Sequence, residues 1–277
     1  MAQIPFPTAA PRSWVGRIEL VPSRNTLKRI GLALILPIAL LIGWQLVVNA
    51  EIYTRGQLPA PIDVYRAAEQ LAAFDQLWIH VEVSFERVLR GFALGSAVAI
   101  GIGLLVGLSP LIGQLIDPTV QAFRAIPSLA WVPLFVLWMG IGEEPKIMLI
   151  AIGVFFPVYA NLVSGIRQID RKMIEAASAY GYRRLSLAWN VTLPASLPYL
   201  MTGLRVGLAQ GWLFLVAAEL IGASQGLGFL LIDGQNSGRA DIIVLSIIML
   251  AVIGKLTDML LERLEKRMLR WSDTVKV

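Results

Sequence analysis

The sequence predicts an all-α protein, a polytopic membrane helical bundle of six transmembrane helices. Hydrophobic residues make up 56% of the 277 positions and charged residues only 16%. The mean hydropathy of +0.68 lies above that of soluble globular domains, which contain fewer apolar and more charged residues. The apolar residues also gather in runs of about 20, the length that a helix needs to cross the hydrocarbon core of a bilayer.

Six runs have the length and composition of a membrane-spanning helix. In the third run, Pro127 and Pro133 each remove a backbone donor, so we expect that helix to bend there, where protein or water satisfies the freed carbonyl groups. The six expected spans are Ile30–Val48, Ser84–Leu108, Pro118–Met139, Pro145–Ile166, Pro198–Leu220 and Ile242–Leu261.

Lys and Arg residues concentrate in residues 1–29, in the loop 167–195 and in residues 263–277. Six spans place these three segments on one side of the membrane, and cytoplasmic loops carry the excess of Lys and Arg. We therefore expect a cytoplasmic tail at each end, a cytoplasmic loop at 167–195 and a core bundle over residues 84–262. The net charge of +5 follows from this asymmetry, so a nucleic-acid partner is not required to explain it.

The first 29 residues are too polar to span a membrane, and no small-residue cleavage site follows the first apolar run. We interpret them as an uncleaved tail and not as a signal peptide. Residues 30–83 hold the first span and a connector, in which Ile62–Leu71 is predicted to form a short amphipathic helix on the outer face, with Asp63 as its N-cap. This helix either packs on neighbouring helices or contacts a partner protein.

Several classes of site are excluded by what the sequence lacks. With no Cys and one His, the chain cannot form a disulfide, a thiolate metal site or a His cluster, so we expect no bound metal. A nucleotide-binding Gly-rich loop is also absent: the Gly254-Lys255 pair is followed by Leu256 in an apolar run. We see no nucleophile with a neighbouring base and expect no catalytic residue, no cofactor in this chain and no enzymatic activity.

The loop 167–195 contains a fixed pattern: Glu175-Ala176-Ala177, three residues, Gly181, nine residues, then Val191-Thr192-Leu193-Pro194. The small Ala side chains permit close approach to a partner, and the helix dipole favours Glu175 near a helix N-terminus. Gly181 lets the backbone turn without a Cβ clash. Pro194 and Pro198 suit the first turn of the fifth span. Without a partner, the same loop would be an amphipathic cytoplasmic turn.

This pattern resembles the EAA signature, Glu-Ala-Ala-x3-Gly-x9-Ile-x-Leu-Pro, of the membrane subunits of type I ATP-binding-cassette importers, with Val191 at the usual Ile. The resemblance implies that the loop binds a separate ATPase subunit through six residues, namely Glu175, Ala176, Ala177, Gly181, Leu193 and Pro194.

Further segments extend the resemblance over nearly the whole chain from the first span onward. The stretches Arg124–Leu134, Gly203–Arg205, Ala217–Glu219 and Gly226–Gly228 are similar to the branch that serves aliphatic sulfonates, taurine and nitrate. Leu137–Ile141, Gly165–Arg171, Gly254-Lys255-Leu256-x-Asp258 and Leu269–Trp271 are most similar to aliphatic sulfonate permeases.

The resemblance also implies the partners and the location. They are two ATPase subunits that use ATP and Mg, a second permease copy in a homodimer, and a periplasmic or lipid-anchored binding protein, all at the bacterial inner membrane and in contact with its lipid. A secondary transporter is a less favoured alternative, because the chain shows no inverted repeat and few coupling-ion groups.

Small residues recur every fourth position in two runs. They are Gly91, Gly95, Gly103 and Gly107 in the second span and Gly203, Gly207 and Gly211 in the fifth. Such stripes permit close helix contact in lipid. They either pack tightly or slide during gating.

Charged and bulky residues within the spans are candidates for the translocation path. An Arg at the bilayer centre costs about 2.5 to 3.5 kcal/mol on insertion scales and so tends to face protein or water. The candidates are Arg87, Arg90, Arg124, Ser128, Trp131, Arg205, Trp212 and Glu219.

Four of these candidates carry specific expectations. An Arg in a wet cavity would attract an anionic substrate, but for Arg205 and Glu219 we favour an ion pair that holds helices together. Trp131 and Trp212 are candidate gate residues, with a lipid-facing or interfacial position as the alternative.

Overall fold

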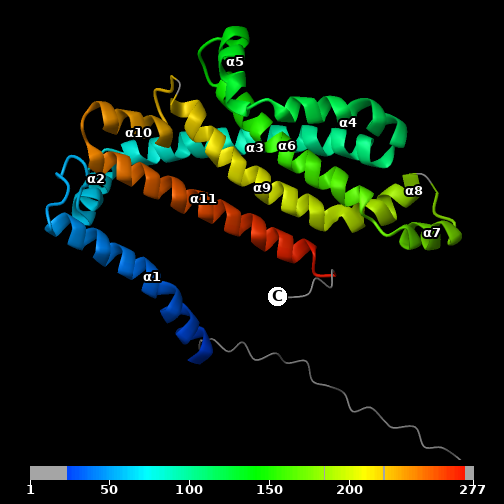
Figure 1. The fold of residues 1–277 in the computed structure, drawn as a ribbon, viewed down its shortest axis with the longest axis horizontal. Helices are drawn as coiled ribbons and strands as arrows, with labels where there is room; N and C mark the ends of the chain where they lie inside the picture. Colours follow the sequence, from blue (N-terminus) through cyan, green and yellow to red (C-terminus); the bar gives the residue numbers. More distant parts are fainter. Residues whose placement is uncertain (1–23, 184, 221, 272–277) are drawn as a thin grey trace, which may run out of the picture. The chain divides into compact units, whose positions relative to one another are not determined.

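The computed structural model describes residues 24–183, 185–220 and 222–271, and every regular element in this part of the chain is a helix (Figure 1). Contacts divide the chain into two units, Met1–Ile52 and Tyr53–Val277. The first unit contains α1 (Arg24–Asn49), whose apolar stretch Ile35–Asn49 overlaps the first expected span. The expectations for residues 1–23 and 272–277 lie outside the described residues.

Four helices of the second unit are long and apolar enough to cross a membrane, judged by length and composition. They are α3 (Gln76–Leu108), α6 (Glu144–Arg167), the continuous helix Ala188–Leu220, and α11 (Ala240–Met268). The third of these joins a π-helical turn, η2 (Ala188–Thr192), to α9 (Leu193–Leu220). These helices confirm the second, fourth, fifth and sixth apolar runs as helices, and α3 begins eight residues before the expected Ser84. The expectation that Pro198 lies in the first turn of the fifth span is wrong, because the helix begins earlier and Pro198 lies inside α9.

The third expected span is not one helix from Pro118. It consists of α4 (Pro110–Ala125), a 3-10 turn η1 (Ser128–Trp131) and α5 (Val132–Met139), with a bend of 87°. The helix begins early because Pro110 suits a first turn and the Ser109 hydroxyl accepts from the Ile112 N–H at 3.4 Å. The expected bend lies at Pro127, while Pro118 lies inside α4.

Two short helices, α2 (Pro61–Ala73) and α10 (Leu227–Asn236), lie at one end of the second unit (Figure 1). At the other end lie α7 (Arg171–Ala179) and α8 (Leu185–Leu187) (Figure 1). The expected N-cap of α2 is wrong by three positions: Ala60 is the N-cap, and the Asp63 carboxylate accepts from its N–H at 3.1 Å. The correction follows from Pro61, which occupies the first helical position and leaves Asp63 one turn inside.

The core of the second unit forms where α6 lies between α3 and α9. Fully buried side chains such as Ile150, Val154 and Leu162 of α6 pack there. The glycine stripes allow this approach. A Cβ at Gly95 of α3 would meet the backbone of Ala151, and one at Gly203 of α9 would lie 3.2 Å from the Val158 Cα.

Gly95→Leu should therefore destabilise the protein, since over-packing a filled contact costs about 1 to 3 kcal/mol. The measurement is the thermal unfolding midpoint of the detergent-solubilised protein. Gly101→Leu is the matched control, because Gly101 lies on the same helix and an added Cβ there would have no atom within 4 Å. Equal midpoints for the two variants would contradict the close contact.

Candidate functional site

The segment between α6 and α9 begins with α7 (Arg171–Ala179). Its N-cap is Asp170, whose carboxylate accepts from the Lys172 N–H at 2.9 Å. The expectation that Glu175 lies at a helix N-terminus is wrong, because Asp170 starts the helix one turn earlier and takes the favourable position at the dipole. Glu175 is instead the fifth helical residue and pairs with Arg171 at 2.9 Å on the exposed face.

The chain turns at Gly181, as the sequence predicts. Its φ of +90° is left-handed, which favours glycine. The Gly181 N–H donates to the Ser178 carbonyl at 3.0 Å and the Tyr182 N–H to the Ala177 carbonyl at 3.1 Å. These two bonds form a Schellman motif that ends α7 sharply.

This segment exposes aromatic side chains among its charged residues. No residue of α7 is buried, and Tyr180 and Trp189 are 87% and 65% exposed. The turn α8 (Leu185–Leu187) and η2 then lead without a break into α9, where Leu193 is half-buried and Pro194 is exposed. Ala176 is exposed and Ala177 half-buried, so the motif residues line an accessible surface.

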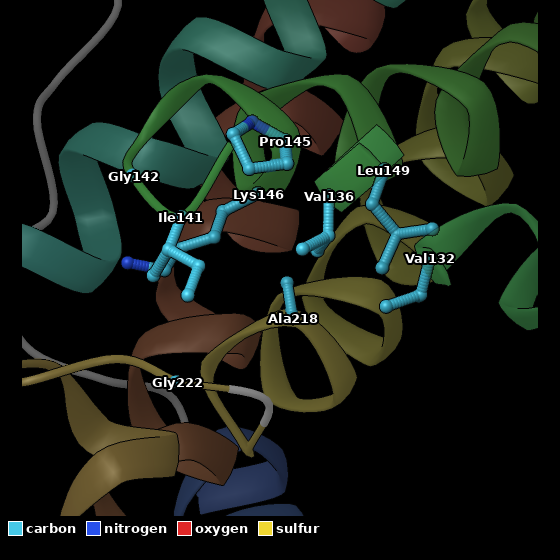
Figure 2. A pocket seen from close by; sticks show the side chains of 9 residues that line it. All are labelled: Val132, Val136, Ile141, Gly142, Pro145, Lys146, Leu149, Ala218 and Gly222. Carbon is cyan, nitrogen blue, oxygen red and sulfur yellow. The ribbon is translucent and has the colours of Figure 1, made fainter. Parts of the chain in front are cut away.

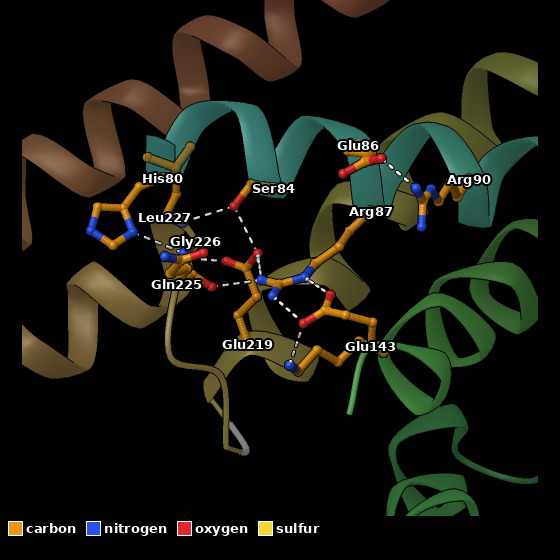
Figure 3. Close-up of polar contacts among 12 residues, drawn as sticks. His80, Ser84, Glu86, Arg87, Arg90, Glu143, Glu219, Gln225, Gly226 and Leu227 are labelled. Carbon is orange, nitrogen blue, oxygen red and sulfur yellow. Dashed lines mark hydrogen bonds and ion pairs between the residues drawn. The ribbon is translucent and has the colours of Figure 1, made fainter. Parts of the chain in front are cut away.

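At the opposite end of the bundle, a carboxylate is buried deep between helices (Figure 3). Glu219, at the end of α9, is 1% exposed. It accepts hydrogen bonds from the Ser84 hydroxyl, the Arg87 guanidinium and the Gly228 N–H, each at 2.7 Å. Three donors from α3 and α10 therefore replace the water that the charge has lost.

Arg87 joins this carboxylate to a second one. Its Nε and Nη2 bind the two oxygens of Glu143 at 2.5 and 2.6 Å, and Nη1 also donates to the Gln225 carbonyl at 2.6 Å. Lys146 donates to Glu143 at 3.0 Å. Two cations thus balance two carboxylates, and the hydrogen bonds from Arg87 lower the pKa of Glu143 to about 2.

The loop before α10 is shaped by the same network. The Gly226 N–H donates to His80 Nδ1 at 2.9 Å and the Leu227 N–H to the Ser84 hydroxyl at 2.8 Å. Gly226 has φ +125°, and any Cβ there would collide with the Glu219 carboxylate. Only glycine fits this backbone conformation and this contact.

The favoured pairing of Arg205 with Glu219 is wrong. Fourteen residues of α9 separate the two, which is about 21 Å along the helix axis at 1.5 Å per residue. Arg205 instead pairs across to α11, with Asp258 at 3.1 Å and Glu265 at 3.2 Å. Both residues hold helices together, but with other partners than expected.

The remaining path candidates lie in different surroundings. Trp212 is buried in the core and donates to the Thr257 hydroxyl at 3.0 Å. Trp131 packs between Phe123 and Phe135, and its Nε1 is buried without a hydrogen-bond partner among the described residues. Arg90 pairs with Glu86 on an exposed face at 2.5 Å.

The last two candidates belong to the α4–α5 region. Ser128 begins η1, and its side chain is outside the described part. Arg124 lies in the last turn of α4 and lines a polar cavity between α4 and α6.

An apolar cavity of about 300 Å³ lies beside the Arg87 network, between α5, α6 and the end of α9 (Figure 2). Val132, Val136, Leu149 and Ala218 are among the residues that line it, and Lys146 borders it while its amine binds Glu143. No group of three or more potential metal ligands occurs in the described ranges. The lining of this cavity is mainly apolar.

Sequence reasoning missed Glu143, Lys146, Asp117 and Tyr159 as members of polar networks. Glu143 lies in a short loop between two spans, where charges are common, and Lys146 lies in the first turn of α6. Asp117 lies next to the proline expected to start the third span. Tyr159 lies in an apolar run, where its neighbours in the sequence give no sign that its hydroxyl has a polar partner. The run Glu143-Glu144-Pro145-Lys146 was the one available signal, since it brings charge to the end of a span.

Replacing Arg87 with Met should cost about 3 to 5 kcal/mol, because it leaves the Glu219 charge buried without its ion-pair partner. The double variant Arg87→Met with Glu219→Leu should recover part of that loss, since the Glu219 charge is removed together with its partner. Unfolding midpoints of the wild type, both single variants and the double variant measure the coupling. Strict additivity of the two single effects would contradict a direct pair.

The Arg87–Glu143 pair should give a specific acid sensitivity. The pKa of Glu143 is lowered from its ordinary 4.5 to about 2, so its stabilisation is complete above 4.5 and is lost as pH falls through 2. Glu143→Gln should therefore lower the unfolding midpoint most near neutral pH and reduce the difference from wild type at low pH. A difference that stays constant with pH would contradict this ionised pair.

Comparison with known proteins places these features in a family. A family model described as the binding-protein-dependent transport system inner membrane component matches residues 97–270. The putative aliphatic sulfonates transport permease protein SsuC of Bacillus subtilis (strain 168) is 36% identical over 92% of this chain and 94% of its own length. Its namesake from Escherichia coli (strain K12) is 39% identical over 86% and 90%.

The taurine transport system permease protein TauC of Escherichia coli (strain K12) is 36% identical over 86% of this chain and 88% of its own. Among solved structures, an inward-facing MetNI methionine ABC transporter has a similar fold, with a TM-score of 0.60, 21% identity, and coverage of 69% of this chain and 97% of that one. The chain therefore belongs to the family of inner membrane components of binding-protein-dependent transport systems, with the fold of ATP-binding-cassette importer permeases.

Proposed function

We propose that this chain forms the membrane path of an importer for small anions, with aliphatic sulfonates as substrates. The names of two relatives at 36% and 39% identity support this choice. Taurine and nitrate are the alternatives, and the 36% identity to a taurine permease supports the former. All three compounds are small and carry an anionic oxygen-rich group, so one permease architecture serves each of them.

The observation that carries the proposal is the form of the segment between α6 and α9. An exposed helix ends in a glycine turn, presents Tyr180 and Trp189 to its surroundings, and leads directly into a 33-residue helix. Exposed aromatic side chains at the end of a bundle are typical of a protein contact. The occupant we propose is the ATPase, one subunit on each of two permease copies.

An ATPase bound to α7 would also define how the chain is oriented in the membrane. With α7 and α8 in the cytoplasm, the alternation of long helices would leave both termini there and would leave α2 and α10 on the outer face. The outer face then receives the substrate from a periplasmic or lipid-anchored binding protein. The basic character of residues 167–195 agrees with a cytoplasmic location.

In this proposal the chain provides the translocation path and the segment that moves, and the ATPase subunits hydrolyse ATP. ATP and Mg are bound by the ATPase, since the only Gly-Lys pair here lies inside α11 and is followed by Leu256. Closure of two ATPase subunits would move α7. Because the helix from Ala188 to Leu220 is continuous, that displacement reaches the Glu219 network at the far end.

The decisive experiment reconstitutes the permease with its ATPase and binding protein in liposomes. Uptake of ethanesulfonate, taurine and nitrate is measured with and without ATP on the side of the membrane that holds the ATPase. ATP-dependent uptake of the sulfonate above the other two supports the proposal. Uptake by the purified permease alone, or with no dependence on ATP, would refute it.

Gly181→Val should abolish coupling with little loss of permease stability. A β-branched residue does not adopt φ +90° without strain, so the turn after α7 would take another shape and the ATPase would no longer bind. The measurements are ATPase recovered with affinity-purified permease and binding-protein-stimulated ATP hydrolysis, each expected to fall at least about tenfold.

Gly56→Val is the matched control, because this glycine has no positive φ and no atom within 4 Å of an added Cβ. It should retain the ATPase. Normal ATPase recovery with Gly181→Val would show that the turn does not serve the contact.

A further inference from the structure

A polar cavity of about 490 Å³ opens between α4 and α6 in the second unit. Its wall runs from Arg167, in the last turn of α6, to Tyr159, eight residues earlier. That distance is about 12 Å along the helix axis. The cavity thus extends well inside a helix long enough to span the membrane, and its volume falls within the range of about 300 to 1,000 Å³ typical of small-ligand sites.

One carboxylate faces this cavity and is already paired. Asp117 of α4 accepts from the Tyr159 hydroxyl at 2.8 Å and from Arg167 Nη1 at 2.9 Å. Its negative charge is therefore balanced by Arg167. This pair also bridges α4 and α6 and holds the two walls of the cavity together.

Arg124 is the second cation of the cavity, and it has no ion-pair or hydrogen-bond partner among the described residues. The four other arginines within α3, α6 and α9 all have a carboxylate within 4 Å. Arg87 has Glu143 and Glu219, Arg90 has Glu86, Arg167 has Asp117 and Arg205 has Asp258. The described part of the cavity therefore carries one uncompensated positive charge.

An unpaired Arg in a membrane-length element is costly, by about 2.5 to 3.5 kcal/mol on insertion scales. The charge is tolerated where it faces water or meets an anion. Arg124 lies exposed at the cavity wall, so no other part of the described chain covers it.

Two uncharged hydrogen-bond donors, Ser164 and Asn161, line the cavity together with Arg124. The Ser164 hydroxyl accepts from Gln168 Nε2 at 2.6 Å, which leaves its own hydrogen to donate. Asn161 donates one amide hydrogen to the Pro157 carbonyl at 2.8 Å and keeps a second. A guanidinium with hydroxyl and amide donors suits an oxyanion with several acceptor oxygens.

We propose that this cavity is a transient site for the oxyanion head group of the transported solute, with Arg124 as its counter-charge. The inference rests on the proposed function and deepens it, because it names the residue that favours anions within the path. Since Asp117 is held by Arg167, the anion meets a net positive wall. A neutral solute of the same size gains nothing from Arg124.

The test uses the absence of cysteine from this chain. Arg124→Cys is made in the full complex with ATPase and binding protein, reconstituted in liposomes, and ATP-dependent uptake of ethanesulfonate is measured. Uptake should fall at least about tenfold, as expected for loss of a charge-assisted hydrogen bond. Reaction with cationic 2-aminoethyl methanethiosulfonate should restore most of it, while neutral methyl methanethiosulfonate should not.

Arg263→Cys, on an exposed face of α11 away from the cavity, is the matched control and should transport like wild type before and after either reagent. Arg124→Lys supplies a variant that needs no labelling: it should keep several times more uptake than Arg124→Gln. Unchanged uptake in Arg124→Gln, or equal rescue by the neutral reagent, would overturn the site.

The outcomes also separate this inference from the proposed function. If the wild-type complex takes up none of the three anions, the function fails. If the wild type transports ethanesulfonate and the Arg124 variants do so equally, only the cavity assignment fails. Binding-protein-stimulated ATP hydrolysis is measured throughout, and it should persist in Arg124→Gln because α7 is untouched.

Discussion

The buried carboxylate of Glu219 organises one end of the second unit. A charge removed from water must be compensated, and here three donors from α3 and from the start of α10 supply the compensation. Arg87, itself 4% exposed, then requires Glu143 to balance it. One buried charge thereby ties together the ends of α3 and α9 and the loops before α6 and α10.

The opposite end of the bundle carries an exposed helix in place of a buried polar network. No residue of α7 is buried, so this helix is held by its caps and by its chain connections more than by packing. The tight α3–α6–α9 core lies between the two ends and is made possible by glycine contacts such as Gly95 against Ala151.

The arginines show how packing assigns a role to a residue type. Arg87 and Arg205 are both in apolar helices, and both are neutralised by carboxylates on other elements. Arg124 differs because Asp117, the acid that lines the same cavity, is taken by Arg167. The same guanidinium group therefore acts as a structural tie at two positions and remains available to a solute at the third.

Composition and local backbone sterics were enough to predict the membrane class, four long helices, the bend at Pro127 and the glycine turn at Gly181, because each of these depends on residues close together in the chain. Packing between helices was needed to reveal that Glu219 pairs with Arg87 and not with Arg205, and that Glu143 and Asp117 join polar networks. Helical periodicity identifies which face of a helix is apolar, but not which helix it meets. Arg87 and Glu219 are 132 positions apart, so only the packing of α3 against α9 brings their charges together.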